Sequence, residues 1–447
     1  MNILENNRVF PVSYNASRNL SSDAAVCYAP WTSLNFNIDG TANICCLNRN
    51  TLTAVPGKTI NEIWNCESFG KLRERILQND LNYDCQICRH QIAAGNFTGV
   101  KARNYDSFIP PDPAHPKTME FFLENTCNLD CIMCNSILSS TIRKNKNLPP
   151  LKKQYDEEFL TVLEPHIPYL KEAVFSGGEP FLIKIYYRIW EKLIRANPEI
   201  IISVITNGTI LNEKIKNLME QARFRINISI DSVDKKTYET IRRNADFDSV
   251  MNHFIWFREY GRRKNLRINI PVCPLTENWC TLPGIVRFAN NHDVSVNFVY
   301  VDRPHSLSLI YRSPDYLKKI IDMYQAEKFD VVSPVSETNI MRFRGLTDDL
   351  IAIQKRPASQ PVTPAIDEML HSLDLKINGF VDQQELPAKE DLKADMSRKM
   401  RDVIAEIPEE SRLRALNLII QSPMERIYKY ANELDASGLA GVIKEIV

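Results

Sequence analysis

The sequence predicts an α/β fold in which helices wrap a parallel sheet that is open or curled into a partial barrel. Between residues 117 and 304, short apolar runs alternate with amphipathic stretches. The runs MEFFLE, EAVFSGG, IIISVITNG, FRINISID, LRINIPV and VSVNFVYV are typical of strands, and the stretches between them, such as YRIWEKLIRA and EKIKNLMEQA, of helices. Ligands in such folds bind at the carboxyl ends of the strands.

The composition and the hydrophobic pattern of the chain change on both sides of this sheet region. At 447 residues we expect two or three domains. Residues 1–108 are rich in cysteine, and residues 109–116, IPPDPAHP, indicate a stiff proline-rich linker. Residues 117–304 form the predicted sheet domain. Strand patterns fade after it, so residues 305–447 are expected to be a helical C-terminal extension that closes the active site or docks a partner.

Composition is that of an ordinary globular protein. Hydrophobic residues make up 44% of the chain, charged residues 25%, and the formal net charge is zero, which gives no support for a nucleic acid or an anionic membrane as partner. There is no apolar run long enough to span a membrane and no signal-peptide core, so we expect a cytoplasmic protein. In such a chain eleven cysteines favour metal ligation over disulfides.

Three of these cysteines, Cys127, Cys131 and Cys134, lie within eight residues with the spacing C-x3-C-x2-C, directly after the strand-like MEFFLENT. A [4Fe–4S] cluster bound by three thiolates keeps one iron for a ligand that is not protein. A structural zinc site with a fourth ligand from elsewhere is the alternative.

This triplet after a strand, followed about one βα unit later by GGEP, resembles the radical S-adenosylmethionine (radical SAM) enzymes. The resemblance covers about residues 117–304 and implies a partial (β/α)6-type barrel. It also implies that SAM binds the open iron and that an electron donor such as flavodoxin or ferredoxin reduces the cluster. SAM is then cleaved to a 5′-deoxyadenosyl radical that abstracts a substrate hydrogen.

Further matches follow in the family's order along the chain. The two glycines of GGEP permit close backbone approach to a ligand, and its carboxylate suits an ammonium group. The resemblance implies that this segment binds the amino group of SAM and that the ITNGT and S-x-D segments with a later arginine hold its ribose and carboxylate. Ordinary turns or helix caps are the alternatives. The residues concerned are Gly177, Gly178, Glu179, Thr206, Asn207, Ser229, Asp231 and Arg242.

A second set of cysteines lies at the front of the chain. Twelve residues separate Cys27 from Gly40, four residues separate Gly40 from Cys45, and Cys85 and Cys88 form a later C-x2-C. Four soft ligands suffice to close a metal site, of zinc or of iron–sulfur. The pattern resembles the SPASM and twitch domains of radical SAM enzymes, here placed before the core, and implies one auxiliary [4Fe–4S] cluster. The neighbouring Cys46 is an alternative to Cys45 as ligand.

Two cysteines near the end of the sheet region are candidates for catalysis. Cys273 and Cys280 lie in INIPVCPLTENWC. A thiol facing the radical site can return a hydrogen atom to substrate carbon, as in redox-neutral epimerases of the family, whereas structural burial is the alternative.

The resemblance implies an oxidoreductase that modifies a ribosomally made peptide by cross-linking, epimerisation or related C–H chemistry. A second hypothesis is dehydrogenation or rearrangement of a small molecule such as an aminoglycoside or alcohol. A third is a non-catalytic, zinc-stabilised scaffold whose helical tail binds a protein.

Overall fold

The computed structural model describes residues 9–48, 53–81, 85–93, 95, 97–109, 114–301, 303–355, 366–382, 389–422 and 424–446. The chain divides into two compact units, Met1–Lys355 and Arg356–Val447.

The first unit is built on a nine-stranded sheet in the order β3-β2-β1-β4-β5-β6-β7-β8-β9. Every pair from β1 to β9 in this order is parallel, and β2 and β3 add an antiparallel edge. The strands are β1 (Ser33–Phe36), β2 (Thr41–Asn43), β3 (Thr53–Ala54), β4 (Thr118–Phe121), β5 (Glu172–Phe175), β6 (Ile201–Thr206), β7 (Arg223–Ile228), β8 (Asn269–Val272) and β9 (Ser295–Phe298).

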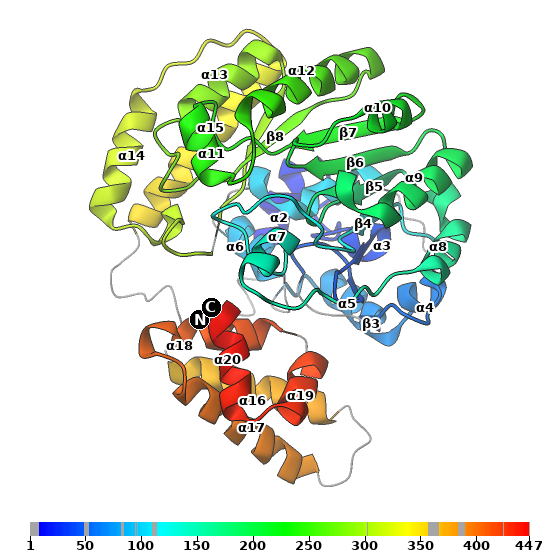
Figure 1. Ribbon diagram of the computed structural model, residues 1–447, viewed down its shortest axis with the longest axis vertical. Coiled ribbons are helices and arrows are strands. Elements are labelled where there is room, and N and C mark those ends of the chain that lie inside the picture. Colours follow the sequence, from blue (N-terminus) through cyan, green and yellow to red (C-terminus); the bar gives the residue numbers. More distant parts are fainter. Residues whose placement is uncertain are drawn as a thin grey trace. The chain divides into compact units, whose positions relative to one another are not determined.

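Helices connect the parallel strands, and Figure 1 shows several of them arranged around the outside of the sheet. The connecting helices are α7 (Ser140–Asn145), α8 (Glu157–Leu163), α9 (Lys184–Ala196), α10 (Glu213–Glu220), α11 (Lys235–Ile241), α12 (Phe247–Lys264) and α13 (Leu282–His292). The predicted α/β class with helices around a parallel sheet is confirmed.

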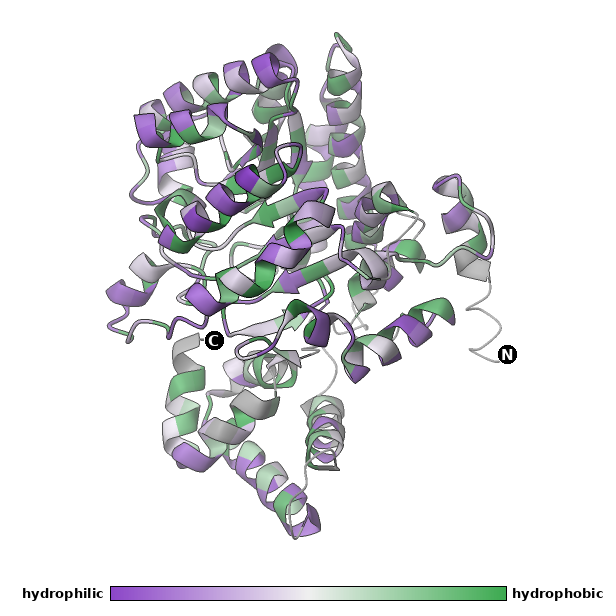
Figure 2. Ribbon diagram, turned by 90° about the vertical axis from the view of Figure 1, so that its right-hand side faces the viewer, coloured by the Kyte–Doolittle hydropathy of each residue, from purple (hydrophilic) through white to green (hydrophobic). Residues whose placement is uncertain are grey.

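Strand alternation gives the sheet one apolar face and one polar face. Phe36, Phe121, Phe175 and Val204 are register partners across four strands and are fully buried. They meet the helices through ring contacts such as Phe36 with Phe159 of α8 and Phe175 with Trp190 of α9, with centroids 5.1 and 5.4 Å apart. This packing fixes the helices to one side of the sheet. A helix buried on one side has one hydrophobic and one hydrophilic face, and Figure 2 shows this as green and purple segments that alternate along the helices.

The opposite face carries polar residues on β1, β4, β6 and β7, with Val174 of β5 between Glu120 and Ser203. Asn35 of β1 pairs with Glu120 of β4, and further along the sheet Ser203 of β6 pairs with Arg225 of β7. Buried carboxylates need partners. Accordingly, Lys101 Nζ lies 3.2 Å from Glu120 Oε1, and Arg225 Nη1 lies 2.8 Å from Glu172 Oε1.

The cysteine-rich front segment is joined directly to this sheet, because β1 pairs in parallel with β4 over four residues. Its remaining elements are α2 (Val9–Ser17), α3 (Ala29–Thr32), α4 (Ile60–Trp64), α5 (Glu67–Leu77), α6 (Gln86–Ala93) and the 3₁₀ segments η1 (Phe97–Gly99) and η2 (Lys101–Phe108). The predicted boundaries at 108, 117 and 304 all fall inside the first unit, and residues 110–113 of the predicted linker lie outside the described residues.

Helices α14 (Pro314–Ala326) and α15 (Pro334–Gln354), from the predicted C-terminal extension, also belong to the first unit. Asn339 of α15 ties them to the sheet, since its Oδ1 accepts from the Val296 N–H of β9 at 2.9 Å. The unit boundary therefore follows these helices rather than preceding them. The division of the chain into functional parts stays a prediction.

The second unit consists of α16 (Ile366–Asp382), α17 (Lys389–Ala405), α18 (Glu409–Gln421), α19 (Met424–Glu433) and α20 (Ala436–Ile446). It has its own apolar core, which includes Leu373, Ile377, Met400 and Leu416. The expected helical character of this end is confirmed for its described residues. None of the described helices of the chain is both long and apolar enough to cross a membrane.

We predict that residues 117–447 will not fold alone. Removing residues 1–116 deletes β1 and exposes the backbone edge of β4, and an open parallel edge beside buried phenylalanines promotes aggregation. We expect the truncated chain to be insoluble or to lack cooperative urea unfolding, as followed by circular dichroism. A soluble monomer with the wild-type midpoint would show that the front segment is an independent domain.

Candidate active site

The predicted cysteine triplet lies in the loop that follows β4, at the carboxyl end of the parallel sheet. Hydrogen bonds to the backbone of this loop hold it on both sides. The Cys127 N–H donates to Ser140 Oγ at 3.0 Å, and the hydroxyls of Ser140 and Thr141 donate back to the Cys127 carbonyl. On the far side, Asp130 N–H donates to Arg243 O and Ile132 N–H to Ile241 O. The loop is thus fixed to the first turn of α7 and to the end of α11.

The three thiols are partly buried, which favours their neutral form. Burial raises the pKa of Cys127, raises that of Cys131 to about 12 and raises that of Cys134 to about 11. Thiolates in such a place need a compensating positive charge, which metal ligation supplies. The donor set of three thiols on one loop fits a [4Fe–4S] cluster with one iron left for another ligand.

The GGEP segment follows β5 and packs its backbone against the start of the cysteine loop. The Gly178 N–H donates to Glu124 O at 3.2 Å, and the Glu179 N–H donates to Thr126 O at 2.7 Å. Gly177 has φ +129°, and a Cβ there would lie 2.6 Å from Glu124 O. A Cβ on Gly178 would collide with the Thr126 carbonyl. The glycines are needed for this close contact between two backbones.

Glu179 is fully buried and its carboxylate is turned into the protein. Its Oε1 accepts from Thr206 Oγ1 at 2.8 Å and from the Phe181 N–H, and its Oε2 accepts from the Asn207 N–H at 2.7 Å. Burial raises its pKa to about 7, although these hydrogen bonds act in the opposite direction. The structure therefore places the Glu179 carboxylate on the end of β6, and its expected contact with the SAM amine stays a prediction.

Asn207 links Glu179 to the first cysteine of the triplet. Its Nδ2 donates to Asn128 Oδ1 at 3.1 Å and lies 3.9 Å from Cys127 Sγ. The predicted residues Glu179, Thr206 and Asn207 are therefore brought together beside Cys127, although they come from two different strand ends.

On the other side of the loop, Asp231 and Arg242 form a buried ion pair, with Arg242 Nε 2.7 Å from Asp231 Oδ2. Asp231 Oδ1 also accepts from the Cys273 N–H at 2.7 Å. Ser229, the first residue of the S-x-D segment, is held through its backbone, which donates to Thr206 O. Arg242 interacts electrostatically with Cys131, so the pair lies beside the second cysteine of the triplet. In this structure Arg242 therefore pairs with the carboxylate of Asp231, and its expected contact with SAM stays a prediction.

The two candidate catalytic cysteines are in different places. Cys273 follows β8, and burial raises its pKa above the ordinary thiol value; Cys131 and Cys134 are among its electrostatic neighbours. Cys280 is exposed and interacts with Tyr324 of α14. Of these two cysteines, Cys273 therefore lies near the triplet, whereas Cys280 lies near α14.

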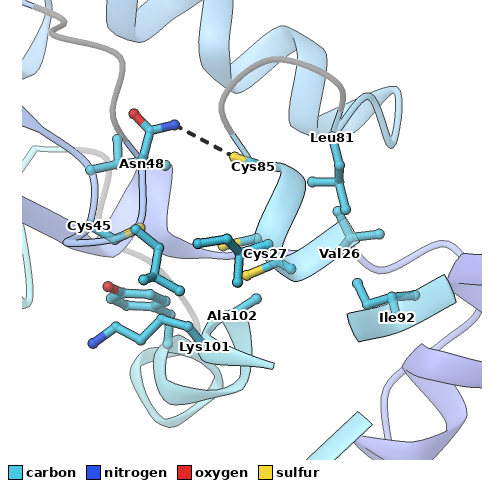
Figure 3. A pocket seen from close by; sticks show the side chains of 14 residues that line it. Val26, Cys27, Cys45, Asn48, Leu81, Cys85, Ile92, Lys101 and Ala102 are labelled. Carbon is cyan, nitrogen blue, oxygen red and sulfur yellow. Dashed lines mark hydrogen bonds between the residues drawn. The ribbon is translucent and has the colours of Figure 1, made fainter. Parts of the chain in front are cut away.

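The front cysteines also converge. Cys27, Cys45, Cys85 and Cys88 line one pocket together with Asn48, Lys101 and Tyr105. Figure 3 shows three of these cysteines reaching it from separate segments. Cys45 lines this pocket, whereas Cys46 is exposed and interacts with Lys101 and Glu120. The pocket holds about 20 Å³, space for one water-sized group, so a four-iron cluster requires the thiols to spread.

Among the residues that the structure describes, no group of three or more His, Cys, Asp or Glu side chains is arranged to hold a metal ion. The structure therefore shows that the cysteines of each set lie near one another. That either set binds a metal stays a proposal.

Several residues that hold the site were not predicted from the sequence. Ser140 and Thr141 bind the backbone of Cys127, and Asn48 Nδ2 donates to Cys85 Sγ at 3.6 Å (Figure 3). For Ser140 and Thr141, the sequence offers one indication, which is the run of serine and threonine residues at the start of a helix soon after the triplet. No local pattern marks Asn48, because its partner lies 37 residues away.

Part of this chain is similar to known proteins. Residues 123–289 match the model of the radical SAM superfamily. The chain contains a radical SAM domain. Enzymes of this family use a [4Fe–4S] cluster and SAM, and the expected family resemblance is confirmed, while the SPASM or twitch part of it stays a prediction.

Curated relatives include the GTP 3′,8-cyclase of Clostridium botulinum (strain Okra / Type B1), 24% identical over 183 residues, which are 41% of this chain and 51% of that protein. The GTP 3′,8-cyclase of Campylobacter jejuni (strain RM1221) is 23% identical over 216 residues, 47% of this chain and 65% of the other. The chain spans about half the length of the first of these relatives.

Similar solved structures include native anSMEcpe with bound AdoMet, with a TM-score of 0.36, 18% identity and coverage of 46% of this chain and 60% of that chain. Streptococcus suis SuiB bound to precursor peptide SuiA has a TM-score of 0.34, 14% identity and coverage of 60% and 61%.

The glycine contact yields a first prediction for the radical SAM domain. Gly178→Ala should destabilise the protein by about 3 kcal/mol or more, because its Cβ collides with backbone that is fixed on both sides. Gly70→Ala is the matched control: its Cβ meets nothing within 4 Å inside α5, so stability should rise by about 0.5–1 kcal/mol. Urea unfolding measures both, and equal midpoints for Gly178→Ala and wild type would contradict the packing described here.

Glu179 yields a pH-dependent prediction. Its pKa is raised from 4.5 to about 7 in the folded protein, so the folded state binds this proton more tightly than the unfolded state. The resulting stabilisation is fully present below pH 4.5 and is lost as the pH rises through about 7. We therefore expect the stability advantage of wild type over Glu179→Gln to fall by about 3 kcal/mol across this window, measured by urea unfolding of cluster-free protein. A difference that is constant or that grows with pH would show that Glu179 is ionised throughout.

Proposed function

We propose that this chain is a radical SAM enzyme in which Cys127, Cys131 and Cys134 hold a catalytic [4Fe–4S] cluster and SAM takes the open iron. One observation carries the proposal: residues from three strand ends and from the end of α11 converge on the cysteine loop. Glu179 and Asn207 approach it beside Cys127, and Asp231 and Arg242 approach it beside Cys131. When bound, the reduced cluster and SAM supply a 5′-deoxyadenosyl radical that takes a hydrogen atom from the substrate.

The chain's own residues have distinct roles in this proposal. The backbone of Gly177 and Gly178 would bind the SAM amine, and Glu179 positions Thr206 and Asn207 through its hydrogen bonds. Asp231 and Arg242 interact electrostatically with Cys131, and Asp231 holds the start of the loop after β8. Cys273 is the candidate hydrogen-atom donor in preference to Cys280, because it lies beside the triplet and burial keeps its thiol protonated.

We propose that Cys27, Cys45, Cys85 and Cys88 bind a second [4Fe–4S] cluster that exchanges an electron with the catalytic site or anchors the substrate. Their convergence on one pocket supports this, and the electron donor would be a flavodoxin- or ferredoxin-like protein. Zinc in this pocket is the competing hypothesis, since four thiolates suit both.

The proposed substrate is a ribosomally made peptide, which the resemblance of the front cysteines to auxiliary-cluster domains supports. A small molecule is the second candidate. It is favoured by the curated relatives, whose name, GTP 3′,8-cyclase, gives a nucleotide as substrate.

The test is metal analysis together with SAM cleavage after anaerobic reconstitution. Two [4Fe–4S] clusters predict about eight irons per chain, and about four when either cysteine set is changed to alanine. Dithionite-reduced wild type should form 5′-deoxyadenosine from SAM, and the variant lacking Cys127, Cys131 and Cys134 should form none. Cys66→Ala, at the N-cap of α5, is the control that should keep all the iron.

The alternatives give different results in the same experiment. About four irons, with zinc retained by the front cysteines, would make the front pocket a structural zinc site and leave the catalytic proposal intact. Zinc in both sites with no 5′-deoxyadenosine would support the non-catalytic scaffold.

A further inference from the structure

A cavity of about 530 Å³ lies beside the cysteine loop. Its walls are Ile38, the segment 123–126 that leads from β4 into the loop, and residues of α7 and the segment after it, up to Lys153. This volume is within the range of small-molecule sites. The lining does not include the GGEP segment, Thr206, Asn207 or Asp231, so the cavity is distinct from the residues assigned to SAM.

The charge of the lining is strongly one-sided. Its basic side chains are Arg143, Lys144, Lys152 and Lys153, and its acidic side chain is Glu124. Lys153 Nζ lies 2.9 and 2.8 Å from the two Glu124 carboxylate oxygens, so the charges of these two residues cancel. Arg143 is oriented by donating to the Pro149 carbonyl. Three positive charges therefore remain in the lining of a chain whose net charge is zero.

Neighbouring acidic residues along the chain are engaged elsewhere. Asp130 Oδ2 accepts from Asn145 Nδ2 at 3.0 Å, Asp156 caps α8, and Glu157 pairs with Arg188. Lys144 and Lys152 are exposed and have no carboxylate partner among the described residues. Cations grouped around a cavity without counter-charges favour binding of an anion.

The cavity shares its walls with the catalytic loop. The carbonyls of Glu124 and Thr126 accept from the GGEP backbone, while the same residues line the cavity. Ser140, also in the lining, bonds both the N–H and the carbonyl of Cys127. A ligand in this cavity would therefore contact residues that hold the backbone of the first cysteine of the triplet. Leu123, Leu148 and Leu151 give the lining an apolar part next to the charges.

We propose that this cavity binds an anionic group of the substrate, a carboxylate or a phosphate, attached to an apolar portion that contacts the leucines. The inference rests on the proposed radical SAM function, since it assigns the ligand of the cavity as the substrate of that site. It gives the substrate a charge class that the cysteine motifs do not specify.

The test is isothermal titration calorimetry of the reconstituted full chain with four probes. Hexaglutamate supplies carboxylates, inorganic tripolyphosphate supplies phosphates, and hexalysine and spermine are the charge-reversed controls. Hexaglutamate or tripolyphosphate should bind, and raising the salt concentration should weaken the binding. Preference for the first probe indicates a carboxylate source, and preference for the second indicates a phosphate source.

The matched variants are Lys144→Gln/Lys152→Gln and, on the exposed face of α14, Lys318→Gln/Lys319→Gln. The first pair should bind the preferred anion roughly tenfold more weakly or worse, and the second should bind it as wild type does. All four lysines are exposed, so both variants should keep the wild-type thermal midpoint.

Three results would overturn the inference: no anion binding by wild type, equal weakening in both variants, or equal affinity for the cationic probes. Displacement of the anion by SAM would place SAM in the cavity and overturn it too. The binding measurement requires no SAM cleavage. Failure to form 5′-deoxyadenosine, in contrast, would contradict the proposed function whatever the titrations show.

Discussion

The arrangement of this site depends on one buried carboxylate. Glu179 bridges the turn after β5 to the end of β6, because its oxygens accept from both Thr206 and the Asn207 backbone. A buried carboxylate with fewer donors would be costly, so its burial and its hydrogen bonds require each other. Asn207 then reaches the first cysteine, and the Gly177–Gly178 backbone contacts the same loop. Three strand ends are thereby held at fixed separations before any cofactor binds.

The second half of the site is held by charge. Asp231 and Arg242 are both buried, and such a pair is tolerated only when its remaining polar atoms are satisfied. The Cys273 N–H donates to the other oxygen of Asp231. The carbonyls of Ile241 and Arg243, on either side of Arg242, accept from the N–H groups of Ile132 and Asp130, and these bonds fix the cysteine loop beside the pair. Loss of either partner would leave a buried charge, typically at a cost of about 3–5 kcal/mol. The pair therefore influences the triplet through the shape of the loop.

Local patterns in the sequence were sufficient for part of this structure. The alternating apolar runs give β4 to β9 in their order, and the spacing of the triplet and of GGEP places both at strand ends. The pairing of β1 with β4 was not predictable, because SLNF is short and its partner lies 85 residues away. The same limit applies to Glu179: its burial depends on donors 27 and 28 residues later, which no local pattern shows. For α14 and α15 the pattern predicted helices correctly, but helical periodicity does not indicate that they pack on β9.

The β1–β4 pairing also gives a physical reason why cysteines at the front of the chain can act with a site formed much later in it. Parallel pairing places Asn35 opposite Glu120, on the polar face of the sheet. Glu120 then accepts from Tyr105 and pairs with Lys101, and both of these residues line the pocket of the front cysteines. Because the triplet follows the same strand, β4 connects the two cysteine sites as a rigid element rather than through a flexible linker. The front segment can therefore have the fixed position relative to the triplet that the proposed electron exchange or substrate anchoring requires.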